Sequence, residues 1–278
     1  MPFPDKPPSP EHNVSAQSPA HELASPDIAQ PLPEPAPPLP WTLYDVLRIV
    51  AAAVIAIGLF SILALGIAVQ HRGGKVTDLP DLARDARIVV PAQLAAYLVV
   101  IAYMVFLLHS RGRTFWREIQ WNWPGITWLA YAALGVALAI VVQTGSALLP
   151  VPKSLPIDRY FRDMAGAYLM AAFGTTVAPL MEELFFRGFL YPSLARKWGV
   201  LASIIVTSAG FALIHTSQLA SAWAPLLLLF IVGLVLTSVR ARTSSVASSF
   251  MMHVGYNTTL FTMLFLASDH FRHLERVS

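Results

Sequence analysis

The sequence predicts an all-α membrane protein, a polytopic transmembrane helical bundle of about seven spans. Of the 278 residues, 55% are hydrophobic and only 13% are charged, whereas an ordinary soluble domain carries roughly 25% charged residues. The mean hydropathy of the chain is +0.57. Several runs contain no charged residue over the ~20 positions that a membrane-crossing helix needs. This composition argues against a soluble enzyme, a nucleic-acid binder and a disordered protein.

The amino-terminal residues 1–42 differ in composition from the rest of the chain. Thirteen of the 22 prolines fall between Pro2 and Pro40, and the same stretch has five acidic residues against one lysine. Such a segment cannot bury enough apolar surface to order itself. The sequence therefore predicts a disordered, proline-rich tail, which serves as a spacer or as a docking segment.

The hydrophobic spans follow this tail in order. The uncharged runs 49–69, 88–108 and 128–149 each match one membrane-crossing helix. The remaining spans are expected at 164–181, twice within 199–239 with a connection near 217–221, and at 243–268. Residues 184–195 would add an eighth span if they form an embedded segment of their own. The predicted regions are thus 43–163, an amino-terminal transmembrane region; 164–268, a core that carries the polar residues; and 269–278, a short tail.

Basic residues in the connections predict the orientation of the bundle, because Lys and Arg concentrate in cytoplasmic loops. Three connections fall on one side of an alternating seven-span arrangement and carry Arg111, Arg113 and Arg117, then Arg196 and Lys197, then Arg240 and Arg242. The amino terminus is therefore expected in the cytoplasm. The connection between the first two spans disagrees, because it holds four basic residues on the predicted outer side. The net charge of +3 reflects these loops, so we expect the lipid bilayer as a partner and no nucleic acid.

One short segment breaks the apolar pattern with two carboxylates and a guanidinium: Glu182, Glu183 and Arg187. A charge at membrane depth costs ~2.5–3.5 kcal/mol on insertion scales, so such residues are usually paired and functional. Glu183 and Arg187 are four positions apart, the helical spacing at which side chains meet. Glu182 would remain free to take a proton from water. The alternative is a charge cluster at the membrane edge that only caps a helix.

Two later spans carry further polar side chains. His215 lies on one span, and His253 and Asn257 lie four positions apart on the last. A lone intramembrane histidine is more often a packing residue. Imidazole, carboxylate and amide groups that converge on one point, however, supply the base and the hydrogen-bond donors needed to hydrolyse an amide. The chain has no cysteine, which excludes thiol nucleophiles and thiolate metal ligands.

These residues form three motifs that resemble those of the CPBP family of intramembrane proteases, which includes the type II CaaX prenyl endopeptidases and the Abi and bacteriocin-immunity proteins. The motifs are Glu182-Glu183-x-x-x-Arg187, Phe211-x-x-x-His215 and His253-x-x-x-Asn257. The resemblance covers roughly residues 165–267. It implies an endopeptidase in which Glu182 and His215 activate water, His253 and Asn257 hold the oxyanion, and Glu183 and Arg187 orient the first pair.

The resemblance leaves the cofactor open between none and zinc. Glu182, His215 and His253 could ligate one zinc ion with a position left for water. A metal-free glutamate–histidine mechanism is favoured, because the sequence offers no carboxylate that could be assigned as partner to either imidazole.

The expected substrate is a membrane-embedded peptide or a lipidated protein such as a prenylated CaaX chain. Localisation in a bacterial inner (plasma) membrane is expected. Two alternatives from another class remain. The same polar residues could belong to a non-proteolytic immunity or adaptor protein, or to a proton-coupled transporter that uses Glu182 and His215 as a relay.

Overall fold

In the computed structural model, the described residues are Met1, 39–72, 79–152, 154–161 and 163–274. They are helical and contain no strand, which confirms the all-α prediction. The predicted tail falls largely outside these residues. From Leu39 onward the chain forms one compact unit, in which the predicted regions 43–163 and 164–268 pack together.

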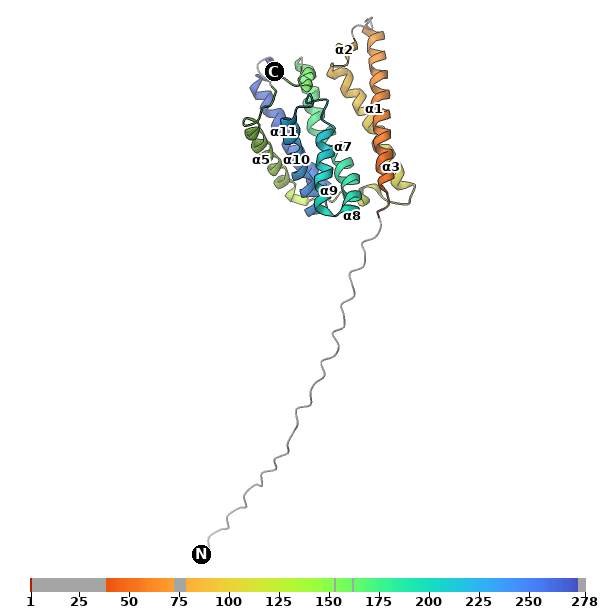
Figure 1. Cartoon of the computed structure of the whole chain (residues 1–278), viewed down its shortest axis with the longest axis vertical. Helices are drawn as coiled ribbons and strands as arrows, with labels where there is room; N and C mark the ends of the chain where they lie inside the picture. The colour runs from red at the N-terminus through yellow and green to blue at the C-terminus, as the bar shows by residue number, and fades with distance from the viewer. Residues whose placement is uncertain (2–38, 73–78, 153, 162, 275–278) are drawn as a thin grey trace. The chain divides into compact units, whose positions relative to one another are not determined.

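Seven long helical segments build this unit (Figure 1). They are α1 (Leu43–Arg72), α3 (Ala86–His109), α5 (Trp128–Ser146), the run α6–α8 (Met164–Trp198), α9 (Val200–Leu213), α10 (Trp223–Thr243) and α11 (Val246–Ala267). Two short helices, α2 (Leu79–Leu82) and α4 (Phe115–Glu118), lie in the connections after α1 and α3. α1 packs on α3, α5 on α11, and α9 on both α8 and α10.

The number of membrane spans differs from the prediction. Among the described helices, five are long and apolar enough to cross a membrane: α1, α3, α5, the run α6–α8 and α10. α9 is shorter, and α11 is not one of the five although it has 22 residues. α11 carries serine, histidine and asparagine side chains, which lower its hydropathy. Residues 184–195 form no separate segment, because they continue the helical run that begins at Met164. The protein is thus an integral membrane protein whose count of seven spans remains a prediction.

Capping side chains and one glycine set several helix boundaries. The carboxylates of Asp85 and Asp163 accept backbone N–H groups at the starts of α3 and α6, and the hydroxyl of Ser245 does the same for α11. Gly199 separates α8 from α9 with a φ of 77°, a conformation open to glycine without steric cost. α8 and α9 therefore meet at Gly199, and the two helices contact one another.

Hydrogen bonds connect the residues just before α1 to the α6–α8 run. Trp41 is buried, and its indole N–H donates to the hydroxyl of Ser193 at 2.8 Å and to the carbonyl of Phe189 at 3.2 Å. The carboxylate of Asp45 is also buried and takes two hydrogen bonds from Arg111, of 2.8 and 2.9 Å. Residues 39–42, which were predicted to be part of the tail, thus belong to the helical unit.

Candidate functional site

The paired glutamates lie between two π-helical turns of the α6–α8 run. The turns are η4 (Phe173–Val177) and η5 (Leu184–Leu190), and α7 (Ala178–Glu183) lies between them. A π-helical turn is rare, is usually a single-turn bulge, and frequently occurs at functional sites. Because its hydrogen bonds are shifted by one residue, it frees backbone groups for other partners. Here the carbonyl of Gly174 in η4 accepts a hydrogen bond from Asn257, and that of Arg187 in η5 accepts one from Arg240.

Glu183 is the centre of a fully buried ion pair. Its Oε1 lies 3.0 Å from Nη1 of Arg187, and both side chains have zero exposure. Arg187 also donates to the hydroxyl of Thr237 at 3.3 Å and to the carbonyl of Gly233 at 3.2 Å. Its guanidinium lies 4.7 Å from the ring centre of Phe211. The pair matches the spacing of four positions, and the additional contacts hold it between α7, α9 and α10.

The same oxygen of Glu183 contacts His253 on α11, a partner that the sequence alone does not indicate. His253 Nδ1 lies 2.9 Å from Glu183 Oε1. This contact corrects the expectation that neither imidazole has a carboxylate partner. Because an ionised carboxylate only accepts hydrogen bonds, Nδ1 of His253 carries the proton. In the neutral ring, Nε2 therefore presents its lone pair.

His215 is oriented in the same way by a backbone group. Its Nδ1 lies 2.9 Å from the carbonyl oxygen of Phe211, which also only accepts. The lone pair of the neutral ring is again on Nε2. The spacing Phe211-x-x-x-His215 thus has a physical reason: the residue four positions earlier supplies the carbonyl that selects the tautomer.

Both Nε2 atoms face the second glutamate. Glu182 Oε1 lies 3.8 Å from Nε2 of His215, and Glu182 Oε2 lies 3.7 Å from Nε2 of His253. These distances exceed a direct hydrogen bond, and such a gap between polar groups suits a bridging water. The carboxylate of Glu182 and the two Nε2 atoms are all hydrogen-bond acceptors. When both rings are neutral, none of these three groups has a hydrogen atom to donate to the others. A water molecule between them would supply the missing hydrogens.

Asn257 lies beside this group on the wall of one cavity. The cavity has a volume of about 570 Å³, and its lining includes Glu182, His215 and Asn257. The amide nitrogen of Asn257 donates to the carbonyl of Gly174 at 2.7 Å, which uses one of its two N–H groups. The four residues expected at the site thus come from three separate segments, α7, α11 and the turn after α9.

Two polar residues of α3 also line this cavity and were not singled out in the sequence. They are Gln93 and Tyr97, one helical turn apart. Tyr97 interacts with both Gln93 and Glu182. The sequence did contain a pattern that could have identified them. An amide and a hydroxyl four positions apart lie on one face of an otherwise apolar span.

The side chains at the site are of the types that zinc binds, but their placement does not fit the ion. Two ligands at ~2.0–2.2 Å from a tetrahedral zinc lie about 3.4 Å from one another, less than the 3.7 and 3.8 Å between Glu182 and the imidazoles. In the described part of the chain, no group of three or more His, Asp or Glu side chains is arranged to hold a metal ion.

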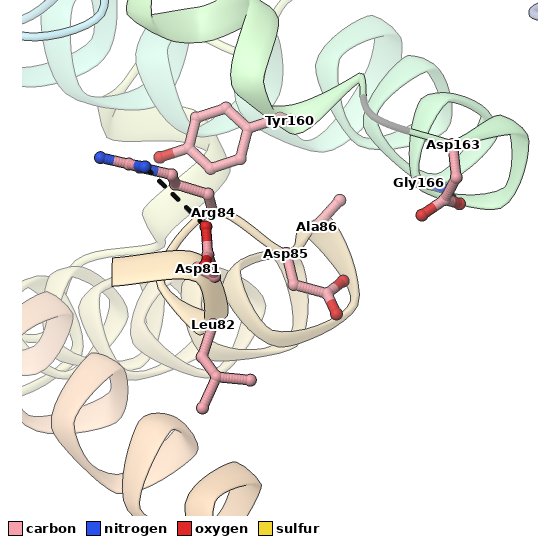
Figure 2. A pocket seen from close by; sticks show the side chains of 8 residues that line it. All are labelled: Asp81, Leu82, Arg84, Asp85, Ala86, Tyr160, Asp163 and Gly166. Carbon is pink, nitrogen blue, oxygen red and sulfur yellow. Dashed lines mark hydrogen bonds and ion pairs between the residues drawn. The ribbon is translucent and has the colours of Figure 1, made fainter. Parts of the chain in front are cut away.

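A second cavity, of about 190 Å³, lies where α2 and α3 meet the start of α6 (Figure 2). Asp81 pairs with Arg84 at 3.9 Å, and Asp85 caps α3. The backbone N–H of Gly166 and the guanidinium of Arg87 hold the pKa of Asp163 below its usual range. The ion pair between Arg87 and Asp163 thus joins the start of α3 to the start of α6.

A comparison with known protein families matches the segment that carries the site residues. Residues 164–259 match the family described as type II CAAX prenyl endopeptidase Rce1-like. This match confirms the resemblance to the CPBP family of intramembrane proteases, and it contains all three motifs. No curated protein and no solved structure matches the chain significantly.

Proposed function

We propose that the protein is an intramembrane endopeptidase that hydrolyses a peptide bond near the membrane, with water activated between Glu182 and His215. The family match supports a protease of the CAAX type. The observation that carries the proposal is the meeting of three acceptors, the carboxylate of Glu182 and the Nε2 atoms of His215 and His253, beside a large cavity.

The first chemical step follows from this arrangement. A water molecule that donates to Glu182 and to Nε2 of His215 directs an oxygen lone pair toward a peptide carbonyl in the cavity. As the oxygen attacks the carbonyl carbon, one proton moves from the water to Glu182, and the carbonyl becomes an oxyanion. The carbon–nitrogen bond then breaks, and this proton passes to the departing amine.

The oxyanion needs hydrogen-bond donors, and two side chains are suited to this role. Asn257 has a second N–H beyond the one bonded to Gly174. His253 can donate through Nε2 only as the imidazolium, after the neutral ring takes up one further proton from bulk water before the attack, because Nδ1 already holds its own proton against Glu183. The carboxylate of Glu183 stabilises that cation, as the aspartate does for the histidine of a Ser-His-Asp triad. In this proposal Arg187 keeps Glu183 ionised and in place.

The proposed setting is a bacterial inner membrane with the amino terminus in the cytoplasm. The substrate is a membrane peptide or a lipidated protein. The competing functions are those of a non-proteolytic adaptor and of a proton-coupled transporter. A variant without the proton acceptor Glu182 distinguishes them from a protease, because only a protease has peptide cleavage to lose.

The deciding experiment is peptide cleavage by purified protein in detergent, comparing the wild type with Glu182→Gln. Turnover is expected to fall by ~10²–10⁴, as for a lost general base. The fold should persist, because a neutral amide is cheaper to bury than a carboxylate. Helicity and thermal unfolding check the fold. Glu118→Gln is the matched control, since Glu118 lies in α4 and pairs with Arg113 at 3.7 Å. If Glu182→Gln cleaves as fast as the wild type, the protein does not use this glutamate for hydrolysis.

A further inference from the structure

Both π-helical turns of the α6–α8 run end just before a proline. η4 ends at Val177, two residues before Pro179, and η5 ends at Leu190, two residues before Pro192. Proline has no backbone N–H, and its ring crowds the carbonyl four residues earlier in an α-helix. A π-helical turn is wider, because its hydrogen bonds join residues five positions apart. Each proline therefore favours the π-helical turn that precedes it.

The turn η5 leaves the carbonyl of Arg187 without a donor in its own helix. In an α-helix this carbonyl would accept from the N–H of Tyr191, but that N–H donates to the carbonyl of Phe186 instead. The donor for a π-helical bond would be residue 192, which is proline and has no N–H. Arg187 is fully buried, and a buried carbonyl without a partner destabilises a fold. The carbonyl therefore needs a donor from another helix.

Arg240 of α10 supplies this donor. Its Nε donates to the carbonyl of Arg187 at 3.1 Å, and its Nη2 donates to the side chain of Gln120 at 2.6 Å. Arg240 is itself buried. A buried guanidinium is costly unless its hydrogen bonds are satisfied, and the proposed chemistry gives Arg240 no other role. Its side chain therefore fixes α10 to the π-helical turn that follows Glu183.

The same arrangement occurs at the other end of α7. The N–H of Ala178 donates to Phe173, residue 179 is proline, and the carbonyl of Gly174 accepts from Asn257 at 2.7 Å. The short helix α7 thus lies between two π-helical turns, and a side chain from another helix pairs with the open carbonyl of each. A π-helical turn holds one more residue than an α-helical turn. Its loss would rotate one side of the run by ~100° relative to the other.

We propose that Arg240 is a positioning residue of the protease. By pairing with the carbonyl of Arg187, it holds η5 in its π-helical form and so keeps Glu183 against His253. This inference rests on the proposed function and adds a residue that acts on the site through the helix backbone. Within the run, Arg187 and Glu183 are joined at 3.0 Å, and the same glutamate oxygen lies 2.9 Å from Nδ1 of His253. A displaced Arg187 would therefore move the carboxylate that orients the imidazole.

Gln120 connects Arg240 to the helix of His253 by a second route. The backbone carbonyl of Gln120 accepts from the N–H of Val246 at 3.0 Å, at the start of α11, and its side chain accepts from Arg240. The next connection is made by Asn122, whose side chain donates to the carbonyl of residue 244 at 2.8 Å. Arg240 thus contacts both the run that carries Glu183 and the segment that holds the beginning of α11.

Two substitutions and one control isolate this role. Arg240→Met keeps an unbranched apolar stem and removes the donors. Pro192→Ala restores an N–H that can reach the carbonyl of Arg187 through a π-helical bond. Arg242→Met is the matched control, because Arg242 is exposed in the same last turn of α10.

The first measurement is the tautomer of His253, observed by solid-state nitrogen NMR of protein with isotope-labelled histidine at a pH where the imidazoles are neutral. The His253 signal is assigned by its absence in His253→Gln. The wild type should show one neutral form, with the proton on Nδ1. Arg240→Met should mix the two neutral forms. It should also lower kcat by ~10²-fold with little change in KM, as for a catalytic group displaced by about 1 Å. Arg242→Met should change none of these quantities.

The second measurement is the unfolding temperature in a double-variant cycle. Arg240→Met should lower this temperature much less when Pro192→Ala is also present, because the backbone then supplies the donor. The combined variant should therefore fold even if Arg240→Met alone does not. A role of Arg240 that is confined to its bond with Gln120 would give the same loss in both backgrounds.

The proposal is overturned if Arg240→Met costs the same with and without Pro192→Ala, including the case in which neither variant folds. It is overturned equally if folded Arg240→Met protein keeps the single tautomer of the wild type or cleaves as fast. The tautomer and the unfolding temperature are measured without turnover. If the wild type cleaves no peptide while both behave as expected, the proposed hydrolysis fails and the contact between Arg240 and the π-helical turn still orients His253.

Discussion

At the scale of single residues, one oxygen atom links two of the three motifs. Oε1 of Glu183 contacts both the guanidinium of Arg187 and Nδ1 of His253, at 3.0 and 2.9 Å. Its other oxygen is buried without a hydrogen-bond partner among the described residues. The charge of Glu183 is thus balanced on one side only, and loss of Arg187 would leave an unmatched carboxylate in an apolar interior.

Replacement of Arg187 by alanine should therefore cost stability and activity together. Breaking a buried ion pair by removing one partner typically costs ~3–5 kcal/mol, and here His253 would also lose its fixed acceptor geometry. Thermal unfolding in detergent and peptide cleavage measure the two effects. Arg113→Ala is the control, because its ion pair with Glu118 is exposed and such pairs contribute ~0–1 kcal/mol. If the Arg187→Ala protein is as stable and as active as the wild type, the ion pair between Glu183 and Arg187 is needed neither for the fold nor for cleavage.

Chelation provides a second residue-scale prediction. The distances of 3.7 and 3.8 Å between Glu182 and the two imidazoles are wide for ligands of one zinc ion. Cleavage is therefore expected to persist after incubation with a strong chelator and to gain nothing from added zinc. The metal content of the purified protein checks the same point independently. Activity that is lost with the chelator and restored by zinc would show that the side chains rearrange to bind the ion.

At the scale of helices, the site depends on the close approach of α5 and α11. Neither Gly135 of α5 nor Gly255 of α11 has room for a methyl group. A Cβ on Gly135 would lie 2.0 Å from the carbonyl oxygen of Met252, and one on Gly255 would lie 2.2 Å from that of Ala132. Gly255 lies between His253 and Asn257, so any shift of α11 that relieves this contact moves both side chains.

Gly255→Ala should consequently reduce cleavage by displacing His253 and Asn257 from Glu182. The backbone of α5 cannot give way as a flexible side chain could, so we expect a lower unfolding temperature as well. Gly145→Ala in α5 is the matched control, because no atom lies within 4 Å of the added Cβ. There the substitution should be neutral or stabilising by up to ~1 kcal/mol, since alanine is the better helix former. Equal behaviour of the two variants would show that α5 and α11 can separate without harm.

At the scale of the whole molecule, the chain divides at Pro38, and residues from Leu39 onward form their own compact unit. The buried side chain of Trp41 helps to hold this unit together. It fills a buried position against Phe189 and donates to Ser193. It thereby joins the beginning of α1 to the run that carries the paired glutamates.

Removal of the amino-terminal residues before Leu39 should thus leave the stability of the fold unchanged, whereas removal of residues after Leu39 should lower it. A protein that lacks residues 2–38 should unfold at the same temperature as the full chain and cleave peptide at the same rate. Trp41→Ala should destabilise the fold by ~3–5 kcal/mol, the usual cost of removing a buried large aromatic side chain. Thermal unfolding of the three proteins in one detergent makes the comparison. If the truncated protein unfolds as early as Trp41→Ala, the tail itself contributes to the fold.

The sequence alone determined the features that depend on local pattern. Hydropathy located the long helices, because each span must match the thickness of the bilayer. The spacing of four positions predicted the ion pair between Glu183 and Arg187, because side chains at that distance share one helix face. The three motifs resemble those of the CPBP family, and the match at residues 164–259 supports this resemblance.

Only the tertiary structure decided how these elements meet. The contact between Glu183 and His253 joins residues 70 positions apart, and no periodicity encodes such a contact. The shared cavity wall formed by Gln93, Tyr97 and Asn257 likewise depends on helices from both halves of the chain. The place of the cavity was also beyond prediction, because helix packing decides it. Packing buries Arg187 and Arg240 and leaves a cavity of about 570 Å³ beside Glu182.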